Sequence, residues 1–324
     1  MTVISFNKKG YDGFIDFIKA YAIIAVLIGH TVPNLDMVAY FVWLGMQVPL
    51  FLLVQAFHVF KKDTPKVLLS KIFQRVLVPF FAIEIITVIL ALIFTTDTSK
   101  QLIASVLTGG GYGPGSYYPW LYLQFALLLP LFAKLLSRYS KVVTLVLFLL
   151  LCEGFEILLS FVNIPEFIYR LLAIRYLFLI WLGWQWTKDG IMINWLTIIL
   201  SLLSLAAIIY FEYFSIDDEP WFYNTDWKCH RWPCYFFVAY GFTAILHLLW
   251  RGISQMIIVS NGVKQLASAS YEIFLIQMST IFLFKVENLA FIQSETVQLL
   301  IWIFIVWFVS IAGGILLHKL INKW

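Results

Sequence analysis

The stretch DFIKAYAIIAVLIGHT, Asp16–Thr31, is apolar along most of its length, with Asp16 and Lys19 near one end and His30 near the other. Apolar runs of similar length recur along the chain, which has 324 residues, 62% of them hydrophobic and 12% charged. A soluble domain carries about twice that share of charged residues, and a membrane-spanning helix needs about 20 mostly apolar residues. The composition therefore predicts an all-α, polytopic membrane protein.

The apolar windows predict about ten membrane-spanning helices in one bundle, forming a single transmembrane domain over residues 1–324. They lie near residues 14–32, 40–60, 76–95, 119–137, 141–162, 168–187, 191–214, 233–251, 267–286 and 297–318. An even number of helices puts both termini on one side. Lysine and arginine gather in the loops on that side, so the positive-inside rule places both termini in the cytoplasm of a cell, beneath its inner membrane.

The charges of the first window share one helical face. Lys19 and His30 are eleven residues apart, which at about 100° per residue brings them back to nearly the same direction, with Asp16 close to the same stripe. The rise between Lys19 and His30 is about 16 Å, half the hydrocarbon thickness. Ionisable groups inside a membrane indicate function, although Asp16 and Lys19 could also pair and reach the interface.

A second polar motif, KIFQRVLVPFF, opens the third window. Lys71 and Arg75 are four residues apart and share a helical face. Two cations on one face suit the binding of phosphate groups, with arginine acting as a bidentate fork and lysine as a point charge. The alternative is that they are ordinary flanking charges on the cytoplasmic side.

Further ionisable residues fall within or beside later windows. Arg170 and Arg175 are expected to enter the bundle from the outer side, where Glu153 or Glu156 could neutralise either of them. A structural ion pair and a substrate contact are both consistent with this pattern. His58 lies near the cytoplasmic end of its helix, where a structural role is the ordinary one.

Two outer loops have unusual compositions. TGGGYGPGSYYPW, residues 108–120, is expected to form a turn-rich extracellular cap, since it has no lysine of the type that a nucleotide-binding loop requires. Cys229 and Cys234 flank the sequence HRWP in the second loop. A disulfide, two free thiols and an incomplete metal site are all open there, and we expect no metal.

Several of these motifs together resemble the acyltransferase-3 family of integral membrane acyltransferases. The family has a basic residue, ten intervening residues and a histidine in its first helix, matched here by Lys19 and His30 after Asp16. Four further segments resemble its later helices: QVPLFLLVQAF, KIFQRVLVPFF, YPWLYLQFALLLPLF and ASYEIFLIQMSTIF. This chain departs from the family pattern where Gln55 replaces a serine and Gln277 replaces a late histidine.

The resemblance implies transfer of an acyl group, usually acetyl, from cytoplasmic acetyl-CoA to a hydroxyl of a surface or lipid-linked carbohydrate in the cell envelope. His30 would act as general base, or as a transient acyl carrier, with Lys19 and Asp16 beside it. Lys71 and Arg75 would hold the acyl-CoA. Aromatic residues of the outer loops, including Tyr117 and Trp120, could stack on sugar rings.

Two other classes of function compete with this interpretation. A transporter or flippase for a sugar or a lipid-linked glycan could use the Asp16, Lys19 and His30 stripe as a proton relay. A sensor or assembly scaffold would leave the buried charges without a role. The partners expected are acyl-CoA, a carbohydrate acceptor and the lipid bilayer, with no nucleic acid; a homo-oligomer is open.

Overall fold

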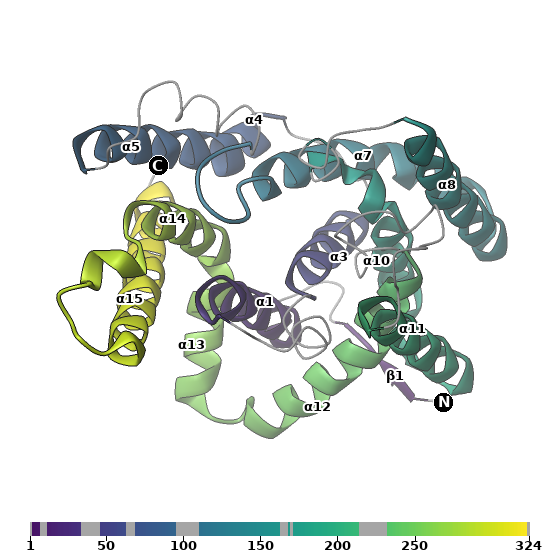
Figure 1. Ribbon diagram of the computed structural model, residues 1–324. Helices are drawn as coiled ribbons and strands as arrows, with labels where there is room; N and C mark the ends of the chain where they lie inside the picture. The colour runs from purple at the N-terminus through teal and green to yellow at the C-terminus, as the bar shows by residue number, and fades with distance from the viewer. Residues whose placement is uncertain are drawn as a thin grey trace.

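The computed structural model describes residues 2–6, 12–33, 46–62, 69–94, 110–162, 168, 171–213 and 232–322. These residues are almost entirely helical (Figure 1). The long helices are α1 (Gly13–Thr31), α3 (Gln47–Phe60), α5 (Val78–Phe94), α7 (Tyr118–Arg138), α8 (Lys141–Phe161), α10 (Leu177–Asp189), α11 (Trp195–Tyr213), α12 (Thr243–Ile253), α13 (Ile257–Ser268), α14 (Ser270–Leu283) and α15 (Glu295–Ile321). Each of the ten predicted windows overlaps one of these helices.

Short elements connect or extend the long helices. They are α4 (Leu69–Ile72), the π-helical turns η2 (Phe73–Leu77) and η7 (Phe237–Phe242), and the 3-10 turns η3 (Ala173–Tyr176), η6 (Trp232–Cys234) and η8 (Val286–Leu289). The strands β1 (Thr2–Ile4) and β2 (Ile191–Ile193) form a two-stranded antiparallel sheet. The sequence predicted a helix from residue 191; β2 occupies its first three residues because they pair with the N-terminal segment.

Helices α1 and α3 lie inside a ring formed by most of the other helices (Figure 1). Half of the apolar window of α1 is buried, and ten residues of α3 are buried, including Leu50 and Ala56. Helix α10 packs closely on α3 because Gly183 faces Ala56: a Cβ atom at Gly183 would lie 2.5 Å from that of Ala56. The centre of the bundle is therefore closely packed around α1, α3 and α10.

The outer helices turn large apolar side chains outward. Examples are Ile86 on α5, Leu150 on α8, Leu203 on α11 and Phe304 on α15, each more than half exposed. Exposed apolar surface on this scale fits contact with lipid rather than water. Within the described residues, five helices are long and apolar enough to cross a membrane, or six when the bent pair α13 and α14 is taken as one span. The chain is therefore a multi-pass membrane protein, and the number ten stays a prediction.

The span that contains α13 and α14 is bent by 68° at Ala269. The serines on either side bond back to the preceding turn: Ser268 Oγ donates to the carbonyl of Gln265 at 2.9 Å, and Ser270 Oγ donates to that of Ala267 at 3.1 Å. Such side-chain bonds compete with the helical hydrogen-bond ladder. The break leaves the first turn of α14 facing the interior of the bundle.

A wider, π-helical turn lies just before α5. The amide N–H of Val78 donates to the carbonyl of Phe73, five residues earlier. Pro79 follows and has no N–H to give to the turn before it. Turns of this kind are frequent at functional sites because they redirect one side chain, and Arg75 is at the centre of this one.

Candidate active site

A cavity of about 400 Å³ lies between α1, α3, the turn η2, the start of α7, the α13–α14 break and the end of α15. It brings together residues far apart in the sequence. Its polar lining residues are Lys19, His30, Gln47, Gln55, His58, Arg75, Tyr117, Tyr118, Tyr122, Ser268, Ser270, Tyr271, Glu272, His318 and Asn322. Four residues predicted from the sequence, namely Lys19, His30, Arg75 and Tyr117, are among them.

Lys19 and Asp16 form an ion pair on the first turns of α1. Lys19 Nζ lies 2.9 Å from Asp16 Oδ1, and both side chains are largely buried, with 23% and 16% of their surfaces exposed. His58, at the last turn of α3, is close enough to feel both charges. The expected pairing of Asp16 with Lys19 therefore exists, while Lys19 also lines the cavity.

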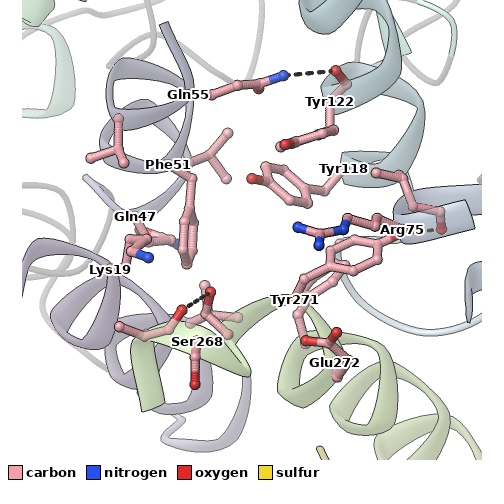
Figure 2. A pocket seen from close by; sticks show the side chains of 18 of the residues that line it. Lys19, Gln47, Phe51, Gln55, Arg75, Tyr118, Tyr122, Ser268, Tyr271 and Glu272 are labelled. Carbon is pink, nitrogen blue, oxygen red and sulfur yellow. Dashed lines mark hydrogen bonds between the residues drawn. The ribbon is translucent and has the colours of Figure 1, made fainter. Parts of the chain in front are cut away.

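Arg75 reaches the cavity from the π-helical turn. Figure 2 shows its guanidinium pointing into the cavity, on the side formed by Tyr118, Tyr122 and Tyr271. Among the described residues, no carboxylate lies within ion-pair distance of Arg75. A cation that faces a partly apolar cavity without an acidic partner is available to bind an anion.

The tyrosines of this wall are held by neighbouring groups. Tyr271 donates its hydroxyl hydrogen to the carbonyl of Val76 at 2.9 Å. The side-chain amide of Gln55 donates to the carbonyl of Tyr122 at 3.2 Å, as the dashed line in Figure 2 marks. The rings of Tyr122 and Tyr271 lie 6.5 Å apart. The wall is therefore an aromatic surface of mutually tilted rings, held in place by hydrogen bonds.

His30 lines the cavity from the last turn of α1. Its Nδ1 atom lies 3.1 Å from Nε2 of Gln277, a fully buried side chain on α14. The same Nε2 atom is 3.4 Å from the carbonyl oxygen of Val26. With Nδ1 held by Gln277, Nε2 is the nitrogen of His30 that remains for a bound molecule.

The described part of the glycine-rich segment packs into the bundle. The sequence predicted instead that this segment forms a cap outside the bundle. The backbone N–H of Tyr112 donates to both carboxylate oxygens of Glu84 on α5, at 3.3 and 3.2 Å. Only 3% of Tyr112 is exposed. Burial, together with the nearby carboxylate of Glu84, raises the pKa of Tyr112 above its usual range. Glu84 thus anchors this segment from within the bundle.

Two glycines explain how the segment comes so close to its neighbours. Gly113 and Gly115 both have φ of +83°, which residues with a side chain rarely adopt. A Cβ atom at Gly113 would lie 2.2 Å from the carbonyl oxygen of Met278. One at Gly115 would lie 2.9 Å from a ring carbon of Phe274 and 3.4 Å from Cε1 of His30. The segment therefore forms the wall of the cavity next to His30.

A second polar pair, formed by Glu272 and His318, also lines the cavity. Nδ1 of His318 is 3.1 Å from Oε1 of Glu272, and Asn322 contacts both ring nitrogens of His318. Glu272 is in the first turn of α14 and His318 in the last turn of α15. We call the part of the cavity formed by Lys19 on α1 and His58 at the last turn of α3, which are close enough for their charges to interact, the Lys19 end.

Some predicted site residues lie outside the cavity lining. Trp120 donates its indole N–H to the carbonyl of Gly110 at 2.6 Å and so fastens the glycine-rich segment. The guanidinium of Arg175 is buried 5.0 Å from the ring centre of Tyr176, and Glu153 lies half-buried on α8. Neither lines the described cavity.

Other predictions fall outside what the structure describes. Arg170 and Cys229 lie outside the described residues, so the alternatives for Cys229 and Cys234 stay open as predictions. Lys71 is in α4, but its side chain is outside the description as well. Within the described ranges, no group of three His, Cys, Asp or Glu residues could hold a metal ion.

The sequence did not single out several lining residues. Tyr118 and Tyr122 are one helical turn apart and could have been recognised as a shared face. His58 was assigned a structural role, yet it lines the cavity. Glu272 and His318 meet only because α14 packs against α15. No local pattern in the sequence brings these two residues together.

Comparisons with known proteins identify the family of the chain. A family model described as an acyltransferase domain matches residues 12–319, nearly the whole chain. Neither the curated proteins nor the solved structures gave a significant match.

Proposed function

Because the chain belongs to the acyltransferase-3 family of membrane acyltransferases, we propose that it transfers an acetyl group from acetyl-CoA to a carbohydrate hydroxyl. The observation that carries this proposal is a single cavity lined by Lys19 and Arg75 as well as by His30. Two cations suit an anionic donor, and an imidazole suits the removal of a hydroxyl proton. The acceptor would be a surface or lipid-linked carbohydrate of the cell envelope.

Coenzyme A would enter at the Lys19 end. Its phosphates are anionic, and Arg75 offers a guanidinium that no described carboxylate neutralises. The serines of the α13–α14 break and Asn322 add hydrogen-bonding groups. A cavity of about 400 Å³ is at the lower end of the size range of small-molecule sites. It suits the acetylated pantetheine arm, with the nucleotide remaining at the mouth.

His30 would act on the acceptor. As the sugar hydroxyl oxygen bonds to the thioester carbon, Nε2 of His30 takes the hydroxyl proton. The bond between carbon and sulfur then breaks, and the imidazolium returns the proton to the sulfur of coenzyme A. The alternative, in which His30 carries the acetyl group transiently, uses the same nitrogen. Tyr117 is retained as an acceptor contact because it lines the cavity.

The remaining predicted contacts are reassigned. Trp120, Arg175 and Glu153 lie outside the described lining, so we propose for them a role in holding the segments around the cavity. We propose that the Lys19 end faces the cytoplasm, as the positive-inside rule requires, and that the protein resides in the inner membrane with both termini inside.

Acetyl-CoA binding to protein in nanodiscs tests the proposal. We expect the Lys71→Ala/Arg75→Ala double variant to bind at least about tenfold more weakly than wild type, since charge-assisted hydrogen bonds are lost. The matched control is Lys134→Ala/Arg138→Ala, another pair four residues apart, exposed on α7 and outside the described lining. This control should bind normally. Wild type that moves a glycan without consuming acetyl-CoA would support a transporter instead.

A further inference from the structure

Gln277 is the polar side chain in direct contact with His30. It projects from the middle of α14, none of its surface is exposed, and its Nε2 atom is 3.1 Å from Nδ1 of His30. Its Oε1 atom is also buried, without a hydrogen-bond partner among the described residues. A buried amide with one atom on the imidazole and the other unpaired is an unusual arrangement, and packing alone does not require it.

The amide decides which nitrogen of His30 carries the proton. When its amino group faces Nδ1, that nitrogen must accept, and a neutral His30 holds its proton on Nε2. When its carbonyl oxygen faces Nδ1, that nitrogen must donate, and Nε2 has a free lone pair. The two orientations differ by a half-turn about the last side-chain torsion and occupy the same volume.

Only the second orientation suits a general base. Nε2 is the nitrogen left for a bound molecule, and it can remove a hydroxyl proton only when it carries none itself. The half-turn gives Oε1 a donor, and it replaces the 3.4 Å hydrogen bond from Nε2 to the carbonyl of Val26 by a contact between two acceptor oxygens. The carbonyl of Val26 keeps its partner in the helical ladder of α1. Each orientation of the Gln277 amide leaves one of its polar atoms unpaired, the oxygen in the first and the amino group in the second. The choice between them therefore depends on which tautomer of His30 the removal of a proton requires.

We propose that Gln277 is a positioning residue whose carbonyl oxygen accepts the Nδ1 proton of His30 and so keeps Nε2 as the proton acceptor. This inference rests on the proposed role of His30 as general base. It assigns Gln277 to the reaction through His30 alone, without contact with donor or acceptor.

The tautomer can be read directly from nitrogen-15 resonances of histidine in the labelled protein. The chain has five histidines, and the signals of His30 are those lost in His30→Ala. We expect a protonated Nδ1 and an unprotonated Nε2 in wild type and in Gln277→Glu, whose carboxylate can only accept. Gln277→Leu should give a mixture of the two tautomers. A wild-type proton on Nε2, or an unchanged spectrum in Gln277→Leu, would overturn the proposal.

Steady-state kinetics provide the second readout. Gln277→Leu should lower kcat by between about tenfold and a hundredfold, the range seen at metal sites when the partner that orients a ligating histidine is removed, with KM for acetyl-CoA unchanged. Gln277→Glu should recover most of kcat. Gln298→Glu is the matched control, because Gln298 is at the start of α15, away from the cavity. Loss of activity in Gln277→Glu equal to that in Gln277→Leu would contradict the proposal.

The two readouts separate this inference from the proposed function. If the wild-type protein transfers no acetyl group, the proposed function fails, while the resonances still report whether Gln277 fixes the tautomer. If transfer occurs but the tautomer is independent of Gln277, only the inference fails.

Discussion

Lys19 and His30 line one cavity from the same helix, although they are eleven positions apart in the sequence. Their spacing returns them to the same face of α1 and sets them about 16 Å apart along its axis. Lys19 lies close enough to His58 for their charges to interact, and His30 lies beside the glycine-rich segment. A donor and an acceptor entering from opposite sides of the membrane could therefore meet along this face.

Arg75 should determine the affinity for the donor. Arg75→Ala should raise KM for acetyl-CoA by about tenfold to a hundredfold, the equivalent of one or two charge-assisted hydrogen bonds. The KM of Arg75→Lys should lie between those of wild type and Arg75→Ala, because lysine keeps the positive charge and loses the bidentate hydrogen bonding of the guanidinium. Initial rates at varied acetyl-CoA measure this, with Arg138→Ala as control. Equal KM in all four proteins would rule out the assigned role.

Lys19 should contribute to donor binding beyond its pairing with Asp16. Lys19→Ala should raise KM for acetyl-CoA by about tenfold, the loss of one charged hydrogen bond. Asp16→Asn should have a smaller effect, because it removes the ion pair and leaves the ammonium at the cavity. The comparison uses the same initial-rate assay. If Asp16→Asn raises KM for acetyl-CoA as much as Lys19→Ala does, then Lys19 serves mainly to neutralise the charge of Asp16.

Gly115 should be intolerant of any side chain. Gly115→Ala requires a left-handed backbone at a cost of about 1–2 kcal/mol and places a methyl group 2.9 Å from Phe274 and 3.4 Å from His30. We expect a loss of kcat with little change in acetyl-CoA binding, since the Lys19 end is untouched. Gly154→Ala is the control, because nothing lies within 4 Å of its Cβ position. Full activity of Gly115→Ala would show that the glycine-rich segment can move away from Phe274 and His30 without loss of function.

The neighbouring glycines of α15 offer a matched test of packing. At Gly314 a Cβ atom would lie 2.5 Å from the backbone of Ile273, whereas at Gly313 the nearest atom is a side-chain carbon of Ile276 at 3.3 Å. Gly314→Ala should destabilise the α14–α15 contact by about 1–3 kcal/mol, while Gly313→Ala should be nearly neutral. Thermal unfolding in detergent measures both. Identical unfolding midpoints of Gly314→Ala and Gly313→Ala would mean that α15 can shift away from α14.

The parts predicted well from sequence are those that a single helix determines. Asp16, Lys19 and His30 share a face because of helical periodicity alone, and Arg75 follows from the charge pattern at the start of a span. Helix positions followed from apolar runs in the same way. These features need no knowledge of how helices pack, so one sequence is enough to find them.

Features that depend on packing between distant helices were missed. Glu272 meets His318 across the α14–α15 contact, and Gln277 meets His30 across 247 positions of the chain. The glycine-rich segment resembled a surface turn because its composition is that of turns. Its glycines instead allow close approach to Met278 and His30. Local composition cannot distinguish a turn at the surface from one that is buried.

Transfer of a labelled acetyl group from acetyl-CoA to membrane glycans tests the central claim most directly, using purified wild type and His30→Ala in nanodiscs. Removal of a general base lowers the rate by about 10²–10⁴-fold, so we predict transfer by wild type and a loss of at least a hundredfold in His30→Ala, with acetyl-CoA binding retained. Transfer by His30→Ala at the wild-type rate would contradict the account.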